Sequence, residues 1–379
     1  MRIGVPKETV EGERRVALVP EVTRKLTSAG HEVLVQAGAG AEALIPDDHF
    51  ADAGANVTDD LAAIWGCDVV VKVAPPAADE VVRLSRDSVL IGFLQPLTNG
   101  DGVRALAVSG ATGFALEAVP RISRAQSMDA LSSQSNIAGY RAALVGAQEL
   151  GRFFPMLMTA AGTIRPATVL VLGAGVAGLQ AIATARRLGA VVQGFDVRAA
   201  VREQVESLGA SFLEFDLGGD LEGEGGYAKE LTQEQQLRQQ ELMAEAIGRV
   251  DVVITTALVP GRRAPILVTE DAVRRMKPGS VVVDLAGEAG GNCELSVPGQ
   301  TVIRHDVKIL APLNVPSTMA EHASQLYARN IEALLGLMVR DGELVLDFED
   351  EVIAGACVTR NGEIVHEGAK AAASAGASA

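Results

Sequence analysis

Short runs of apolar, often β-branched residues alternate along this chain with stretches of helical periodicity. In the amino-terminal part, such runs fall at residues 31–36, 68–73, 88–93 and 110–115. Helical patterns lie between them, for example at residues 20–29 and 102–108. Buried parallel strands are near-continuous apolar runs that are joined by helical crossovers. The pattern therefore predicts a doubly wound parallel sheet in residues 1–132.

A second α/β unit is predicted farther along the chain. Its apolar runs fall at residues 168–172, 190–196, 211–215, 250–255 and 280–284, with a short pair near Val302 and at 307–310. Long helical patterns flank it at residues 135–154 and 316–338. In the first of these, one stripe holds Ile137, Tyr140, Leu144 and Ala147. We predict an α/β protein with two Rossmann-like, doubly wound parallel-sheet domains joined by long helices.

The end of the chain is expected to return to the first domain, which has no carboxy-terminal helix of its own. The predicted division is residues 1–132 plus 312–368 for the first domain and 133–311 for the second. The tail, 369–379, is rich in Ala, Ser and Gly, and we expect it to be disordered, as a frayed end or a linker remnant. A glycine-rich break at 216–240 predicts a long loop, which is either functional or disordered.

Composition suits this architecture. Of 379 residues, 48% are hydrophobic but only 3% are aromatic, and 40 are glycine, which fits close packing of helices on sheets. The net charge is −15, so we expect no binding to nucleic acid; the acidic surface serves solubility or docking. The three cysteines show neither a disulfide framework nor metal-ligand spacing.

The sequence contains neither a signal-peptide core nor an apolar run of about 18 residues. We therefore expect a soluble chain in a reducing compartment, with no membrane span and no metal.

The strongest motif is Gly173-x-Gly175-x-x-Gly178, which follows a predicted strand and opens a helix. In that context it is the fingerprint of a dinucleotide-binding turn. The first glycine permits the turn, the second lets the backbone approach a pyrophosphate, and the third lets the helix pack on the strand. The helix amino terminus offers free N–H groups to the phosphates. A glycine-rich turn without a ligand is the alternative.

The end of the next strand bears on the choice of dinucleotide. Asp196 lies 23 residues after Gly173 and is expected to accept hydrogen bonds from the adenosine ribose. Its carboxylate would repel a 2′-phosphate, which favours NAD(H) over NADP(H). Arg198 keeps NADP(H) open as an alternative, because a nearby Arg accommodates that phosphate.

Two later loops also follow strands, at the edge of the sheet where ligands bind. In the loop 255–265, Leu258 is a candidate for packing on a dinucleotide; the alternative is a loop without ligand contact. The loop 284–293 has glycines that permit close backbone approach, and its Glu288 is either functional or a solvated carboxylate.

Residues 121–140 combine Arg, Gln, Asp and Ser, with no His, Cys or Lys. Such side chains orient a carboxamide and offset the charge of an oxidised nicotinamide. The candidates are Arg121, Gln126, Asp129 and Ser132. The same residues are also compatible with a polar helix cap on an ordinary exposed face.

Together these motifs resemble the NAD(H)-binding component, the alpha subunit, of proton-translocating NAD(P) transhydrogenases. The stretches that carry the resemblance are 121–129, 132–136, 158–162, 173–182, 195–198, 225–230, 254–258 and 290–293, within a span from 2–8 to 357–360. Alanine dehydrogenase is similar in fold and shares residues 2–8.

The resemblance implies NAD(H) in a cleft between two domains. It places the nicotinamide among Arg121, Gln126, Ser127, Met128, Asp129 and Ser132. It assigns the phosphates and the adenosine to Gly173, Gly175, Val176, Gly178, Asp196, Val197 and Arg198. Tyr227 would lie on a mobile loop that closes over the nucleotide, with Gly226 and Gln239 nearby, and Leu258 would contact the cofactor.

The resemblance also implies a homodimer that docks on a membrane proton-channel subunit and on a component that binds NADP(H). The implied reaction is direct hydride transfer between NAD(H) and NADP(H), AB-specific (Si-Re) and coupled to proton movement in the partners. The implied location is cytoplasmic, on the inner face of the bacterial cytoplasmic membrane.

An alanine dehydrogenase-like amino-acid oxidoreductase is the alternative. That enzyme uses a Lys and a catalytic His: Lys72 matches the Lys, but Gln95 stands where the His is expected. Loss of the His removes the natural acid–base group near neutral pH, whereas direct hydride transfer needs no proton donor. A regulatory NAD-binding module without catalysis is the third hypothesis, and the complete Arg/Gln/Asp/Ser set argues against it.

Overall fold

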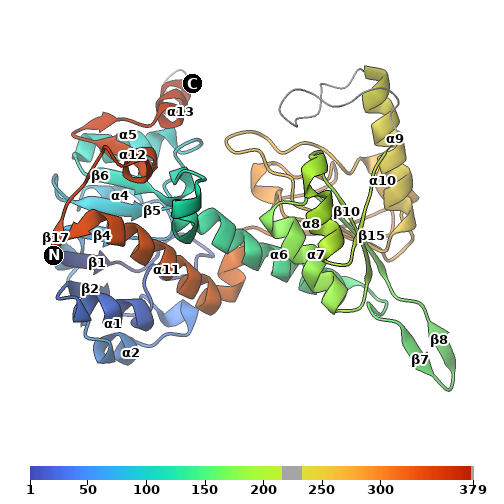
Figure 1. Ribbon diagram of the computed structural model, residues 1–379, viewed down its shortest axis with the longest axis horizontal. Helices are drawn as coiled ribbons and strands as arrows, with labels where there is room; N and C mark the ends of the chain where they lie inside the picture. The colour runs from blue at the N-terminus through green and yellow to red at the C-terminus, as the bar shows by residue number, and fades with distance from the viewer. Residues whose placement is uncertain (216–232, 377–379) are drawn as a thin grey trace. The chain divides into compact units, whose positions relative to one another are not determined.

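The computed structural model describes residues 1–215 and 233–376, of which 233–236 and 375–376 by their backbone only, and divides the chain into two compact units (Figure 1). Unit 1 comprises Met1–Gln134 and Pro316–Ala379, and unit 2 comprises Ser135–Val315. Each unit contains a predominantly parallel sheet. The predicted α/β class with two Rossmann-like sheets is confirmed.

Among the described residues, the sheet of unit 1 has the strand order β19-β18-β6-β5-β4-β1-β2-β3. The strands are β1 (Arg2–Val5), β2 (Glu32–Gln36), β3 (Asn56–Thr58), β4 (Val69–Val71), β5 (Val89–Gly92), β6 (Thr112–Ala115), β18 (Cys357–Arg360) and β19 (Glu363–Ile364). All pairs from β3 to β6 are parallel, whereas β18 pairs antiparallel with β6. The last strands therefore complete a sheet that the first residues begin.

Helices cover both faces of this sheet. Successive residues of β5 pack on opposite faces: Val89 and Ile91 belong to one apolar cluster, and Leu90 belongs to another. Buried side chains of α1 (Pro20–Ser28), α11 (Ala320–Met338) and α12 (Glu351–Ala356) join the first cluster. Those of α3 (Leu61–Trp65), α5 (Gly100–Ser109) and α13 (Glu367–Gly376) join the second. The remaining short elements are α2 (Asp47–Asp52), α4 (Ala78–Val81), η1 (Ala41–Ala43), η2 (Leu116–Ala118), η3 (Ser123–Met128), η7 (Val315–Met319), β16 (Val339–Arg340) and β17 (Glu343–Leu344).

The sheet of unit 2 has the order β11-β10-β9-β12-β13-β15-β14 among the described residues. Its strands are β9 (Thr168–Leu172), β10 (Val191–Phe195), β11 (Ser211–Phe212), β12 (Val252–Thr255), β13 (Val281–Asp284), β14 (Thr301–Arg304) and β15 (Val307–Leu310). Each lies within or next to an apolar run of the sequence. Of these described strands, only β14 runs antiparallel to its neighbour.

Unit 2 is covered on both faces in the same way. In β9, Val169 and Val171 pack with buried residues of α6 (Ala130–Glu149), α7 (Val176–Arg187) and α8 (Arg202–Ser207). Leu170 and Leu172 pack with those of α9 (Gln233–Arg249) and α10 (Glu270–Arg275). Short 3₁₀ segments are η4 (Ala199–Val201) and η6 (Gly287–Ala289).

Three predicted segments were wrong in their bounds or nature. The helix predicted at 135–154 runs over Ala130–Glu149, because Asp129 accepts hydrogen bonds from Ser132 and starts it earlier. The predicted break at 216–240 gives way to α9 at Gln233; residues 216–232 lie outside the described part of the chain.

Residues 369–376 of the tail, which was predicted to be disordered, instead belong to α13, whereas 377–379 lie outside the described residues. Ala369 and Ala373 are buried, and the Arg104 guanidinium donates to the carbonyl of Ala373. Alanine is the best helix former, and its small side chain lets α13 lie close to α5, where a Cβ on Gly100 would meet the Ala372 carbonyl at 2.6 Å.

A hairpin between α6 and β9 was not predicted. It consists of β7 (Leu157–Thr159) and β8 (Gly162–Ile164), paired antiparallel as a separate two-stranded sheet (Figure 1). Within the described residues, no helix is long and apolar enough to span a bilayer.

Candidate dinucleotide-binding site

The order of strands in unit 2 places a candidate site at the carboxyl edge of the sheet. β9 lies between β10 and β12. The strands β10 and β11 therefore extend the sheet on one side of β9, and β12 and β13 extend it on the other. In open parallel sheets, ligands bind outside the carboxyl ends of the strands at such a switch point. Here the loops that begin at Gly173, Asp196 and Thr256 follow β9, β10 and β12.

The glycine-rich turn has the geometry that a dinucleotide requires. Gly173 has a φ of +97°, in the left-handed region that suits glycine. A Cβ on Gly178 would lie 1.8 Å from the Gly173 carbonyl oxygen, so the helix can approach the strand only without a side chain there. A Cβ on Gly175 would meet no described atom within 4 Å. The backbone at Gly175 is therefore open to a ligand.

The first turn of α7 offers unused N–H groups. Gly175 is its N-cap residue, and among the described residues no side chain caps it. Its first turn carries no acidic residue, and two Arg residues lie in its last turn. The positive end of a twelve-residue helix thus faces the turn, which suits a pyrophosphate.

Asp196 and Arg198 hold each other at the end of β10. The carboxylate accepts from the Arg198 backbone N–H, Nε and Nη2, each at 2.9 Å, and from the Ala174 N–H at 2.8 Å. Partial burial alone would raise the pKa of Asp196, but these hydrogen bonds outweigh it and lower the pKa. A fixed carboxylate therefore lies beside the glycine-rich turn, and the Arg198 guanidinium is engaged with it.

The apolar candidates at this edge are accessible. The exposed fraction is 38% for Val176, 66% for Val197 and 56% for Leu258. Gln239 lies half-buried in α9. Gly226 and Tyr227 lie outside the described residues.

The candidates for the nicotinamide belong to unit 1 and lie between residue 121, just before η3, and the first turn of α6. Arg121, Gln126 and Ser127 are exposed, whereas Met128 is buried. Asp129 accepts from the Ser132 N–H at 2.8 Å and from its hydroxyl at 2.6 Å. This is the helix-cap arrangement that the sequence left open, and it also fixes the carboxylate and the hydroxyl next to Gln126.

Two contacts hold η3 in place, and sequence analysis missed both. Arg124 makes two 2.9 Å hydrogen bonds to Asp350, the N-cap of α12. Asn330 in α11 donates to the Ser127 carbonyl at 2.8 Å and accepts from the Ser133 hydroxyl. The partners are about 200 residues apart in sequence, so no local pattern reveals them.

Glu288 has a backbone partner in the structure. Its carboxylate accepts from the Asn314 N–H at 2.7 Å, and its side chain is exposed. This contact agrees with the solvated-carboxylate alternative.

The carboxyl edge of the other sheet, in unit 1, carries a buried cluster of charges. Lys72 follows β4, is fully buried, and pairs with Glu80 at 3.0 Å and with Glu8 at 3.4 Å. Gln95 has a φ of +53°, and its N–H donates to Glu117 at 2.6 Å. Burial raises the pKa of Glu117 to about 7. The Lys72 ammonium is thus neutralised by carboxylates of the chain itself.

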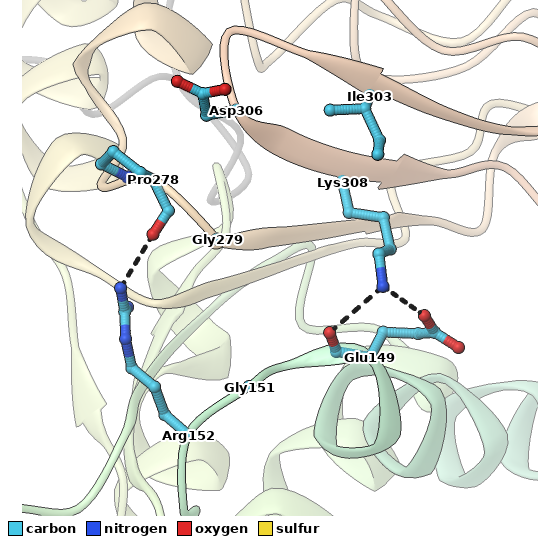
Figure 2. A pocket seen from close by; sticks show the side chains of 8 residues that line it. All are labelled: Glu149, Gly151, Arg152, Pro278, Gly279, Ile303, Asp306 and Lys308. Atoms are coloured by element: carbon cyan, nitrogen blue, oxygen red, sulfur yellow. Dashed lines mark hydrogen bonds and ion pairs between the residues drawn. The ribbon is translucent and has the colours of Figure 1, made fainter.

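A cavity of about 370 Å³ lies at the opposite, amino-terminal edge of the unit 2 sheet (Figure 2). Lys308 donates to Glu149 at 2.7 Å, and Arg152 donates to the Pro278 carbonyl at 2.9 Å and to Asp251 at 2.7 Å. The two cations that line the cavity are therefore bonded to groups of the chain itself. The cavity lies away from the glycine-rich turn.

Comparison with known proteins agrees with this geometry. The family model of the alanine dehydrogenase/PNT amino-terminal domain matches residues 4–138, and that of the carboxy-terminal domain matches 142–367. An NAD(P) transhydrogenase alpha subunit chain of Rhodospirillum rubrum is 53% identical over 376 residues, which cover 97% of this chain and 98% of the relative.

A transhydrogenase structure from Sinorhizobium meliloti superposes with a TM-score of 0.85 at 44% identity, over 97% of this chain and 99% of that one. Alanine dehydrogenase of Mycobacterium tuberculosis is 35% identical over 329 residues, 84% of this chain and 82% of the relative. The chain therefore belongs to the alanine dehydrogenase/PNT family, and within it to the NAD(P) transhydrogenase alpha subunits.

Proposed function

We propose that this chain is the NAD(H)-binding component of a proton-translocating transhydrogenase. The observation that carries the proposal is the glycine-rich turn at the uncapped start of α7, with the carboxylate of Asp196 beside it. The 53% identity to a transhydrogenase alpha subunit extends over nearly the whole of both chains. The Asp196–Arg198 pair favours NAD(H), because the guanidinium that would accept a 2′-phosphate is bonded to a carboxylate instead.

The contribution of this chain to the reaction is position and electrostatics. When bound, the dihydronicotinamide supplies the hydride, and NADP⁺ on a partner component accepts it. The α7 amino terminus holds the pyrophosphate, and Asp196 holds the adenosine ribose. Asp129 and Arg121 set the charge around the nicotinamide, while Gln126 and Ser132 fix the rotation of its carboxamide. We assign Tyr227 to closure over the nucleotide by resemblance alone.

The Lys and the His that an amino-acid dehydrogenase uses are not available at the edge of the unit 1 sheet. An amino-acid substrate needs a cation for its carboxylate and a group that moves protons. Lys72 is buried and paired with Glu8 and Glu80, and Gln95 cannot act as an acid or base near neutral pH. This arrangement favours the transhydrogenase over the alanine dehydrogenase alternative.

The partners are a membrane proton channel and an NADP(H)-binding component, which places this chain at the inner face of the bacterial cytoplasmic membrane. Transfer is AB-specific (Si-Re). The chain forms a homodimer, for which the β7–β8 hairpin offers a surface: Met158 is 75% exposed and Ile164 48%. An isolated two-stranded hairpin is marginally stable in water, so a second copy that covers it is physically reasonable.

Reconstitution tests the function. The purified chain is mixed with membranes that carry the partner subunits, and reduction of an NAD⁺ analogue by NADPH is followed, with alanine plus NAD⁺ as a parallel assay. We expect transfer only when the membranes are present, and none with alanine. Turnover of alanine by the chain alone would contradict the proposal.

Light scattering tests the dimer separately. We expect a dimer for the natural chain and a weakened dimer for Met158→Glu, because the charge would have to be buried in the contact. A monomeric natural chain would refute the homodimer.

A further inference from the structure

One buried side chain holds the loop that carries Leu258 through hydrogen bonds. Asn292 follows β13 and is fully buried. Its amide nitrogen donates to the Ala257 carbonyl at 2.9 Å and to the Pro265 carbonyl at 2.8 Å, and its amide oxygen accepts from the Ala257 N–H at 3.0 Å. Two carbonyls face the nitrogen and one N–H faces the oxygen, so only this orientation of the amide satisfies all three groups.

The backbone of Asn292 fastens the far end of the same loop. Its carbonyl accepts from the Leu267 N–H at 2.8 Å and from the Val268 N–H at 3.0 Å. Asn292 thus contacts both ends of residues 257–267, which we call the 257–267 loop. Between these ends, Leu258 and Val259 remain 56% and 44% exposed. The loop is closed at its base and presents an apolar tip.

Asp284 holds the segment that contains Asn292 through hydrogen bonds. This carboxylate is fully buried at the end of β13. It accepts from the Cys293 N–H at 2.9 Å, from the Ser296 hydroxyl at 2.6 Å and from the Thr255 hydroxyl at 2.9 Å. The segment that contains Asn292 is therefore tied to the end of β12, the strand from which the 257–267 loop leaves.

Thr256 links this arrangement to the glycine-rich turn. Its hydroxyl donates to the Gly173 carbonyl at 3.0 Å, and its N–H donates to the Leu172 carbonyl at 2.8 Å. One run of short contacts consequently joins the turn after β9 to Ala257 and Asn292.

We propose that Asn292 is a positioning residue for the dinucleotide: it closes the 257–267 loop and so holds Leu258 at a fixed place relative to the glycine-rich turn. The inference rests on the proposed function, since it deepens the role of the same edge. Asn292 itself touches neither nucleotide nor reacting atoms. Its effect on binding passes through the backbone of Ala257, the neighbour of Leu258.

A double-mutant cycle with Asn292→Ala and Leu258→Ala tests this link. The readouts are the NADH dissociation constant and the midpoint of thermal unfolding. Asn292→Ala is expected to weaken NADH binding by about tenfold in the natural background, but by about twofold or less when Leu258 is already Ala. Such coupling is not expected from a general loss of stability.

Asp251→Ala is the matched control. Asp251 is also buried and accepts from the Thr168 N–H and hydroxyl, from Arg152 and from Lys277, but at the amino-terminal edge of the same sheet. We expect it to lower the unfolding temperature and to leave NADH affinity unchanged. If Asn292→Ala does not fold, Asn292→Asp enters the same cycle: it keeps the acceptor for the Ala257 N–H and loses both donors.

The outcomes separate the inference from the proposed function. Multiplicative, uncoupled losses for Asn292 and Leu258 would overturn the positioning role and leave the dinucleotide site intact. NADH affinity that is unchanged in Leu258→Ala would show that the cofactor does not contact this loop, and the inference would fail while the glycine-rich turn remained the candidate site.

Discussion

At the scale of single residues, the chain uses charge pairs and hydrogen bonds to fix the groups that would face a nucleotide. Asp196 is held by Arg198, and Asp129 by Ser132. All four residues could be selected as candidates from the sequence, because they follow the end of a predicted strand or open a helix. The sequence did not predict the contacts of the Asn292 and Asn330 side chains, whose partners lie 27 to 203 residues away in sequence. Contacts of that kind depend on topology and leave no local pattern.

The first prediction at this scale concerns orientation of the nicotinamide. Asp129→Asn and Gln126→Asn should slow hydride transfer by about a hundredfold while NADH binding weakens by only a few-fold, because misplacement costs rate more than affinity. Single-turnover transfer and an NADH titration provide the two numbers. Equal losses in rate and affinity would argue that these residues only bind.

Burial of Glu117 raises the pKa of its carboxyl group to about 7. Between about pH 4.5 and 7 its carboxyl stays protonated in the folded chain but ionises on unfolding, so stability falls as the pH rises. Glu117→Gln should remove that fall and be more stable than the natural chain by about 3 kcal/mol at pH 8, with no difference at pH 4. Denaturant unfolding at both pH values checks it; an equal gain at both would exclude ionisation as the cause.

At the scale of elements, apolar runs located nearly every strand, because strands buried on both faces are continuous in sequence. Errors arose where small or polar residues form helices. Residues 369–376 of the tail belong to α13, which packs against α5, and α9 starts at Gln233. The first segment is rich in Ala, Ser and Gly and the second begins with Gln and Glu, so packing on a neighbour decides the outcome.

The strand–turn–helix element makes a matched pair of predictions. In Gly178→Ala the new methyl group would lie 1.8 Å from the Gly173 carbonyl, so we expect a loss of about 3 kcal/mol in the free energy of unfolding. In Gly175→Ala the new methyl group meets no described atom within 4 Å, so we expect the free energy of unfolding to fall by less than about 1 kcal/mol. NADH binding should nevertheless weaken. Unfolding curves and NADH titrations on both variants test this, and a reversed order would contradict the proposed geometry.

At the scale of the whole molecule, the two sheets have the same central strand order but differ in the residues at their carboxyl edges. The edge of the unit 2 sheet has a glycine-rich turn and an uncapped helix, whereas the edge of the unit 1 sheet is filled by Lys72 and its carboxylates. The unit 2 edge is suited to hold a dinucleotide, whereas at the unit 1 edge Lys72 is paired and Gln95 stands in place of the His of an amino-acid dehydrogenase. The central task of the chain in the proposed function is to present NADH for direct transfer.

Isotope transfer tests that claim most directly. NADH with deuterium at the A position of the nicotinamide C4 is mixed with this chain, NADP⁺ and membranes that carry the partner subunits, and the NADPH formed is analysed by mass spectrometry. The account predicts that the deuterium appears in NADPH without loss to water, and that B-labelled NADH transfers none. Deuterium released to solvent would contradict direct hydride transfer.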